Sequence, residues 1–201
     1  MRRVITLDEG LNILEEAIVK ARMILDGYQT NALFTPEEYM KFYDCVYFMC
    51  VQHHPHEYSE QLYERFKRAL EESIFLRVLP SLMDKNDASL LIELLHMWAN
   101  YKVMAKCLGG FFLYLDRYFA NCKSVASLND VSVHCFHDLV CSQFYQRFLD
   151  AAISLISQER DGKPIDRELL KNVSTFFVEI GGCGNTSYYE NFEKVLQWQL
   201  I

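Results

Sequence analysis

The spacing of apolar residues is the feature that most limits how this chain can fold. After residue 7 they recur every three or four positions, as at Leu11, Leu14, Ile18 and Leu25. This period places them on one face of an α-helix, whereas a half-buried strand would alternate apolar and polar residues. We find no convincing alternating segment in the sequence. The pattern therefore predicts an all-α protein.

Start and stop signals divide the chain into seven predicted helices. The clearest start is Thr35–Glu38, where Thr suits the N-cap, Pro the first helical position and two acids the first turn. Pro55 marks a break, Pro80 and the polar run after it are expected to interrupt the third helix, and Gly109-Gly110 to loosen the fourth. The predicted helices lie between Thr6 and Gly27 and at about 36–52, 56–78, 88–120, 129–160, 166–180 and 188–201.

A connector at 161–164, with Gly162 and Pro164, is the one candidate domain boundary. Five predicted helices precede it and two follow. Two short helices bury little apolar surface by themselves, so the segment after the connector is not expected to form a core alone.

Composition and charge exclude several classes of function. Apolar residues make up 51% of the 201 positions and charged residues 23%, which is typical of a globular protein. The net charge of −7 disfavours nucleic acid and an anionic membrane surface as partners. The first residues lack the apolar stretch of a signal peptide, and no run approaches 18 apolar residues. We expect a soluble protein of the cytoplasm and nucleus.

Seven cysteines are present, an odd number, and most lie inside apolar helical runs without a CxxC spacing. We interpret them as reduced, buried thiols of an intracellular protein.

Two groups of histidine and cysteine could in principle bind a metal. They are His53, His54 and His56 beside Cys50, and His134, His137 and Cys141 on one helix face. A structural zinc site needs four converging ligands, and no HExxH motif occurs. We expect a solvated loop and core or interface histidines, with no metal and no cofactor. The hypothesis of a metal protein or an enzyme that uses these groups stays open as an alternative.

No motif for catalysis is recognised. The glycine-rich run at 181–187 lacks the Lys-Ser/Thr of a phosphate-binding loop and does not follow a predicted strand. GxSxG does not occur. We therefore expect a chain that is not an enzyme.

The helix predicted at 36–52 has more apolar surface than one core-facing stripe requires. One side of its helical wheel carries Phe42, Cys45, Val46 and Met49, and the adjacent side carries Tyr39, Met40, Tyr43, Tyr47 and Cys50. The first set is an ordinary core stripe. The second is rich in tyrosine and methionine, which are enriched at protein interfaces. Either a partner covers this second side, or the helix is central in its own bundle.

Five segments carry a resemblance to a known family. YMKFYDCVYFMC, HPHEYSEQLYERFKRALEESI, WANYKVMAKCLGGFFLYLDRYF, LNDVSVHCFHDLV and especially QERDGKPIDRELLKNVSTFFVEIG resemble the N-terminal region of a cullin, more closely a plant cullin of the first type. The similarity covers nearly the whole chain and weakens after Gly182. It implies an elongated stalk of five-helix cullin repeats. Residues 1–160 would form the first, adaptor-binding repeat and 161–201 the incomplete start of a second.

The resemblance also implies partners. In first-type cullins the second and fifth helices of the first repeat bind a Skp-type adaptor of BTB/POZ fold that carries an F-box protein. This places Tyr39, Met40, Tyr43 and Tyr47 of the second helix against the adaptor. In the fifth helix it implies Val133, Phe136 and His137, with His137 in place of a family-like arginine. The implied function is a non-catalytic scaffold module of a Skp–cullin–F-box ubiquitin ligase in ubiquitin-dependent protein catabolism.

One departure from the family pattern limits this reading. The family's C-terminal domain, which recruits a RING subunit and carries the lysine modified by a ubiquitin-like protein, has no counterpart in these 201 residues. We therefore expect no RING subunit to bind this chain. The alternative function is that of a truncated, non-productive paralogue that competes for adaptor. We also expect exposed apolar surface around Phe176, Phe177, Phe192 and Trp198.

Overall fold

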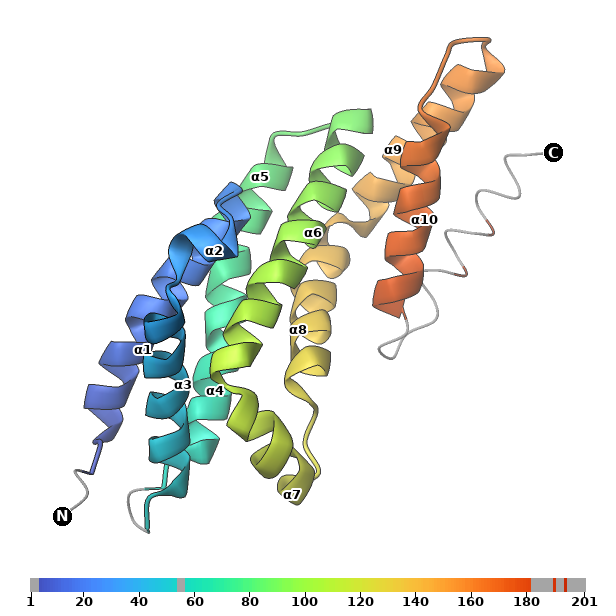
Figure 1. Cartoon of the computed structure of the whole chain (residues 1–201). Coiled ribbons are helices and arrows are strands. Elements are labelled where there is room, and N and C mark those ends of the chain that lie inside the picture. The colour runs from blue at the N-terminus through green and yellow to red at the C-terminus, as the bar shows by residue number, and fades with distance from the viewer. Residues whose placement is uncertain (1–3, 54–56, 182–189, 191–193, 195–201) are drawn as a thin grey trace. The chain divides into compact units, whose positions relative to one another are not determined.

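The computed structural model describes residues 4–53, 57–181, 190 and 194, and every regular element in that part of the chain is helical (Figure 1). The all-α prediction is confirmed. The η1 segment is a 3₁₀ turn, and η2, η3 and η4 are π-helical. The elements are α1 Leu7–Arg22, η1 Met23–Asp26, α2 Thr30–Leu33, α3 Pro36–Val51, α4 Ser59–Ser73, η2 Ile74–Val78, α5 Leu79–Met83, α6 Asp87–Phe111, η3 Leu115–Ala120, α7 Asn121–Lys123, α8 Leu128–Phe136, η4 His137–Cys141, α9 Ser142–Arg160 and α10 Arg167–Gly181.

The predicted helix starts hold better than the predicted breaks. The side chain of Thr35 accepts a hydrogen bond from the Glu38 backbone N–H, and the Glu38 carboxylate accepts one from the Thr35 N–H, which completes a capping box at the start of α3. Pro80 itself does not interrupt the helix, since α5 follows the π-helical η2 directly and continues to Met83. The break falls in the polar run, as expected, at 84–86 before α6 begins at Asp87. The glycines at 109 and 110 lie in the last turn of α6, which ends at Phe111.

Contacts divide the chain into two units. The first comprises Met1–Ser73 and Asn100–Ser132, and the second Ile74–Ala99 and Val133–Ile201. The predicted boundary between the two repeats, at 160/161, rests on the connector and on the resemblance to the family. The division by contacts does not test it, so it stays a prediction. The predicted helix at 188–201, with Phe192 and Trp198, lies outside the described residues.

In the first unit, α1 and α3 approach closely. A Cβ added to Gly10 would lie 2.1 Å from the Met49 sulfur, so any side chain at this position would require the Met49 side chain to move. Charged pairs lie along the same junction. Lys41 contacts Glu16 at 2.7 Å, and Lys20 pairs with Glu38. The hydrogen bond from Lys20 lowers the pKa of the Glu38 carboxyl below its ordinary value, so the pair is charged at neutral pH.

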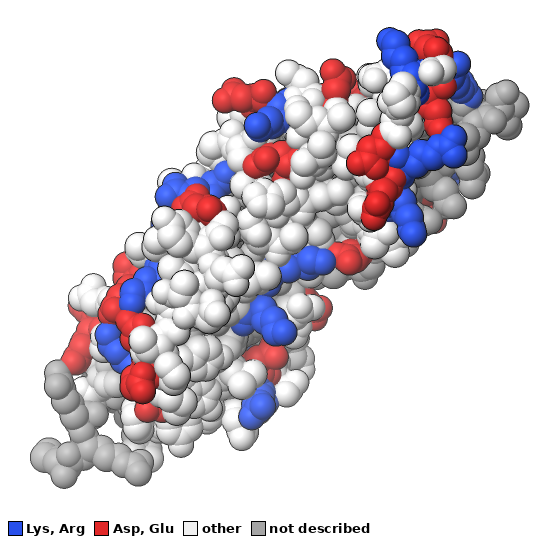
Figure 2. Space-filling model, turned by 45° about the horizontal axis from the view of Figure 1, so that its top comes forward, with Lys and Arg blue, Asp and Glu red and all other residues white. Residues whose placement is uncertain are grey.

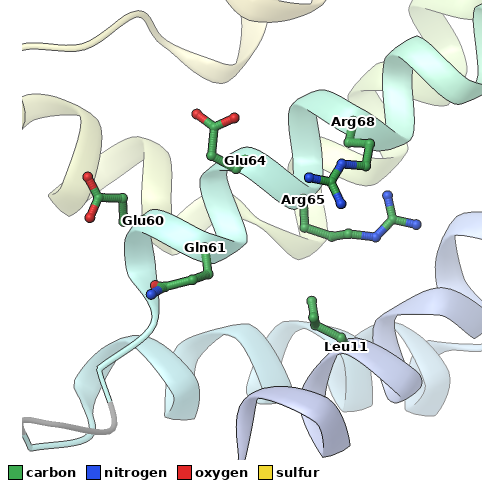
Figure 3. A pocket seen from close by; sticks show the side chains of 6 residues that line it. All are labelled: Leu11, Glu60, Gln61, Glu64, Arg65 and Arg68. Atoms are coloured by element: carbon green, nitrogen blue, oxygen red, sulfur yellow. The ribbon is translucent and has the colours of Figure 1, made fainter.

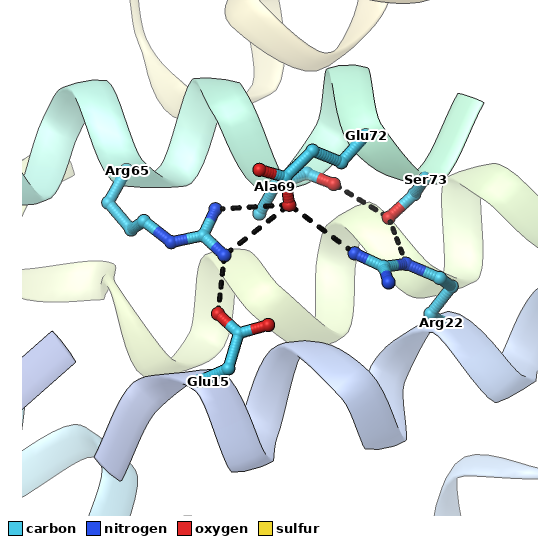
Figure 4. Close-up of polar contacts among 6 residues, drawn as sticks. All are labelled: Glu15, Arg22, Arg65, Ala69, Glu72 and Ser73. Carbon is cyan, nitrogen blue, oxygen red and sulfur yellow. Dashed lines mark hydrogen bonds and ion pairs between the residues drawn. The ribbon is translucent and has the colours of Figure 1, made fainter. Parts of the chain in front are cut away.

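A polar cluster joins α1 to α4 in the same unit. Figure 4 shows Arg65 and Arg22 directed at the Glu72 carboxylate, at 3.4 Å and 3.5 Å. Arg65 also contacts Glu15 at 2.6 Å, and the Arg22 Nε donates to the Ser73 hydroxyl at 3.3 Å. The arginine side chains are only 11% and 14% exposed, so their stems pack along the helices while the guanidinium groups are paired.

The second unit has its own aromatic core. The Trp98 ring lies 4.8 Å from Phe136 and 5.6 Å from Phe176, and its Nε1 donates to the Glu179 carboxylate at 2.8 Å. Phe176 and Phe177 are 1% and 0% exposed, so the prediction that they form exposed apolar surface is wrong. Helix α10 buries its phenylalanines inside this unit.

The capping box at the start of α3 gives a first testable prediction. Replacing Thr35 with Ala removes the side-chain acceptor for the Glu38 N–H, and we expect the free energy of unfolding to fall by about 1 kcal/mol. Urea denaturation followed by circular dichroism measures this change. The control is Gln29→Ala, because Gln29 occupies the N-cap of α2 without a side-chain hydrogen bond there. A Thr35→Ala variant as stable as the Gln29 variant would contradict the capping role.

Candidate protein-binding surface

Helix α3 buries the core stripe predicted for it. Phe42, Val46 and Met49 are fully buried, and Cys45 is 4% exposed. Cys50, expected on the second face, is also buried, at 7%. The ordinary stripe is therefore slightly wider than the helical wheel indicated.

The rest of the second face remains open. Met40 is 52% exposed, Tyr39 and Tyr47 are each 36% exposed, and Tyr43 is half-buried. The neighbouring Phe48 is 41% exposed. The alternative, in which the bundle covers both sides of this helix, does not hold for these side chains. We call Tyr39, Met40, Tyr43 and Tyr47 the open face of α3.

Two further tyrosines extend this face. The parallel rings of Tyr43 and Tyr47 lie 6.5 Å apart, Tyr47 meets the edge of Tyr114 at 5.2 Å, and Tyr114 stacks on Tyr118 at 4.5 Å. Tyr118 is 56% exposed. We call these four residues the tyrosine row.

The sequence prediction missed Tyr114 and Tyr118, although their spacing of four residues in YLDRYF places both on one helix face. Burial, with smaller contributions from Cys50 and the neighbouring tyrosines, raises the pKa of Tyr114 above its ordinary value. The Tyr114 phenol therefore stays protonated and can donate a hydrogen bond at neutral pH.

The residues predicted in the fifth helix belong to the second unit. Val133 and His137 are half-buried, and the His137 Nδ1 lies 2.8 Å from the Asp138 carboxylate. Phe136 is 0% exposed, packed on Trp98 and Phe176. Because its side chain belongs to the core, we do not carry Phe136 into the proposed surface. Roles for Val133 and His137 remain predictions.

Two grooves among the described residues lack the groups that catalysis requires. Figure 3 shows one in the first unit, where Leu11 of α1 lies across from charged side chains of α4. It is lined by Leu11, Glu60, Gln61, Glu64, Arg65 and Arg68, with no serine, cysteine or histidine among them. A groove of the second unit contains Arg147, whose guanidinium donates to the carbonyls of Met83 and Lys85. Neither groove combines a nucleophile with a base.

Charged side chains of both signs are intermixed on the face shown in Figure 2, and Lys and Arg form no continuous patch there. That face therefore does not present the basic surface that a nucleic-acid backbone requires. Among the described residues, no helix has the length and apolar character needed to span a membrane.

In the described part of the chain, no three His, Cys, Asp or Glu side chains are arranged to hold an ion, and the first suspected group is not tested because two of its members lie outside that part. His53 is exposed, and His54 and His56 lie outside the described residues. Burial raises the pKa of Cys141 to about 12, so at neutral pH its sulfur is a protonated thiol.

Comparison with known proteins decides the family. The family model described as "Cullin alpha solenoid domain" matches residues 12–199. This chain belongs to the cullin family. That assignment agrees with the all-α fold.

Cullins of plants are among its relatives. Cullin-1 of rice (Oryza sativa subsp. japonica) is 46% identical over 196 residues, which cover 97% of this chain and 26% of the relative. Putative cullin-like protein 2 of Arabidopsis thaliana is 38% identical, with 96% and 52% covered. Cullin-like protein 3 of the same plant is 31% identical, with 91% and 70% covered. This cullin chain therefore spans about a quarter of the length of the rice relative and about half of the second.

Burial of the thiols gives a prediction about reactivity. Burial raises the pKa of Cys45 and Cys107 to about 11 and that of Cys50 to about 12, whereas Cys122 is exposed. Since the thiolate is the reactive form, iodoacetamide at pH 7.5 should modify Cys122 and leave the buried thiols unmodified until denaturant is added. Peptide mass spectrometry measures this, with Cys122→Ser as the control. Rapid labelling of Cys107 in the folded protein would contradict the buried arrangement.

The contact between Tyr47 and Tyr114 gives a third prediction, on the coupling of the two rings. In a double-mutant cycle with alanine at both positions, we expect a coupling free energy of about 0.5–1.5 kcal/mol, because the rings meet edge to face. Chemical denaturation of the four proteins gives this value. A control cycle pairs Tyr47 with the exposed Tyr28, and its effects should be additive. Equal coupling in both cycles would mean that the tyrosine row carries no specific interaction.

Proposed function

We propose that this chain is the adaptor-binding part of a cullin scaffold in a Skp–cullin–F-box ubiquitin ligase, within ubiquitin-dependent protein catabolism. Its partner is a Skp-type adaptor of BTB/POZ fold carrying an F-box protein. The observation that carries the proposal is the open face of α3, where apolar and aromatic side chains stay exposed beside a complete core stripe. Membership of the cullin family supports it.

The residue types on the open face suit a protein partner. Tyrosine offers a large contact area at low cost in side-chain entropy, and methionine adapts its shape to an irregular surface. Charges within Tyr39–Phe48 are limited to Lys41 and Asp44, so few ions need to be dehydrated when this stretch is covered. Such a depletion of charge at the centre is typical of interface cores.

The side chains of the tyrosine row are already ordered in the free chain, which favours binding. Its rings already contact one another in the free chain, at 5.2 Å between Tyr47 and Tyr114 and 4.5 Å between Tyr114 and Tyr118. A side chain that is already held in place loses less rotamer freedom when a partner binds. The row therefore presents a largely preformed surface.

The proposed role is non-catalytic. The two grooves described above bring together charged, polar and apolar side chains without a serine, cysteine or histidine, and the cysteines with large pKa shifts are buried as thiols. A scaffold needs none of this chemistry, because its contribution is to hold partners.

Adaptor binding is tested by titrating the full chain with a purified Skp-type adaptor–F-box complex in a calorimeter. Met40→Ala and Tyr43→Ala should each weaken binding by about tenfold or more, as expected for residues at the centre of an interface. Val19→Ala is the matched control, because Val19 is 50% exposed on α1, outside the open face. Thermal melts check that every variant is folded.

Two results would overturn the proposal. One is a folded wild-type chain that does not bind the adaptor complex at micromolar concentrations. The other is Met40 and Tyr43 variants that bind as tightly as the Val19 control.

A further inference from the structure

Tyr39 is the residue of the open face whose side chain packs against Phe111 and Gly110 of α6. Its ring packs on Phe111, with 4.8 Å between the ring centroids, and 36% of the residue stays exposed. The hydroxyl end lies over the backbone of α6 at Gly110. A Cβ added to Gly110 would lie 1.9 Å from the Tyr39 Oη and 3.0 Å from its Cζ, which is far inside van der Waals contact.

Comparison with the adjacent Gly109 shows that the lack of space for a Cβ is specific to position 110. Both glycines lie inside α6, and neither has a positive φ, so the backbone requires glycine at neither. A Cβ added to Gly109 would meet nothing within 4 Å. Glycine is unfavourable inside a helix relative to alanine. At position 110 the absence of a side chain makes room for the Tyr39 ring.

The hydroxyl of Tyr39 is partly buried in this arrangement. Burial raises the pKa of the Tyr39 phenol above its ordinary value, with a smaller contribution from Cys107 of α6, so the phenol is protonated at neutral pH. The exposed part of Tyr39 lies next to Met40 in the sequence and belongs to the open face.

We propose that Gly110 is a positioning residue for adaptor docking: because it has no side chain, the Tyr39 ring can pack against α6 beside Phe111, and this sets the surface that the open face presents to its partner. This inference rests on the proposed function. A side chain at position 110 pushes the ring outward, away from Phe111, and alters the surface that Met40 and Tyr43 share with it.

The experiment compares Gly110→Ala with the matched control Gly109→Ala in the full chain. Both changes put alanine into the same helix, and only the first meets Tyr39. Gly110→Ala should weaken binding to the adaptor–F-box complex by about tenfold, whereas Gly109→Ala should bind like the wild type. Thermal melting should show both variants folded.

Removal of the Tyr39 side chain distinguishes positioning from a general structural effect. Tyr39→Phe deletes the atom that would lie 1.9 Å from the new methyl group, so Tyr39→Phe/Gly110→Ala should recover part of the lost affinity. In a Tyr39→Ala background, Gly110→Ala should have no further effect on binding. If Gly110→Ala alone does not fold, these double variants still measure the coupling.

A structural readout separates this inference from the proposed function. Nuclear Overhauser contacts between the rings of Tyr39 and Phe111 should be lost in Gly110→Ala and retained in Gly109→Ala, whether or not an adaptor binds. If the Gly110→Ala variant loses these contacts but the wild-type chain does not bind the adaptor, the proposed function is refuted. The docking role of Gly110 is then refuted with it. The positioning inference is itself overturned if Gly110→Ala keeps the ring contacts, if it binds adaptor as tightly as Gly109→Ala, or if the Tyr39 backgrounds do not change its effect.

Discussion

Phe111, the last residue of α6, makes the contact on which the geometry of the first unit depends. Its ring meets three others, those of Phe34, Phe42 and Tyr39, at 5.2 Å, 5.3 Å and 4.8 Å. Phe34 and Phe42 are buried, and Tyr39 is partly exposed. One buried ring therefore fixes both the core side of α3 and the start of its open side. Because aromatic pairs have preferred geometries, this contact specifies an orientation as well as burying area.

Because its core side is fixed by these contacts, α3 keeps its position in the unit even though its open face is not covered. The capping box fixes the start of α3, Gly10 allows α1 to approach Met49, and ion pairs with α1 close the junction. Exposed tyrosine and methionine then add no strain to the fold. Their cost is exposed apolar surface, which a partner can cover.

Local signals in the sequence were sufficient to predict the start of α3 and its core-facing residues, because both depend on neighbouring residues. Thr35 and Pro36 located the start of α3, and the 3.6-residue period identified Phe42, Val46 and Met49 as core. The same wheel placed Met40 outside the core stripe, but it left open whether the bundle or a partner covers this residue. The helical class and the family were also predictable from the sequence.

Errors occurred where distant segments meet. Phe136 was assigned to the surface through the resemblance to the family, but its ring is buried against Trp98 and Phe176, which are both far from it in the sequence. Phe176 is covered by Trp98, 78 positions earlier in the sequence, which no local pattern shows. Tyr114 could have been found from its spacing to Tyr118, but its contact with Tyr47 needs the fold.

The two methionines of α3 differ in what oxidation would do to them. The Met40 thioether is on a half-exposed residue and accessible to peroxide, whereas that of Met49 is buried against Gly10. Conversion to the sulfoxide makes an apolar side chain polar. Oxidative damage to this helix therefore reaches its outward side first and changes its surface chemistry while the α1–α3 junction remains intact.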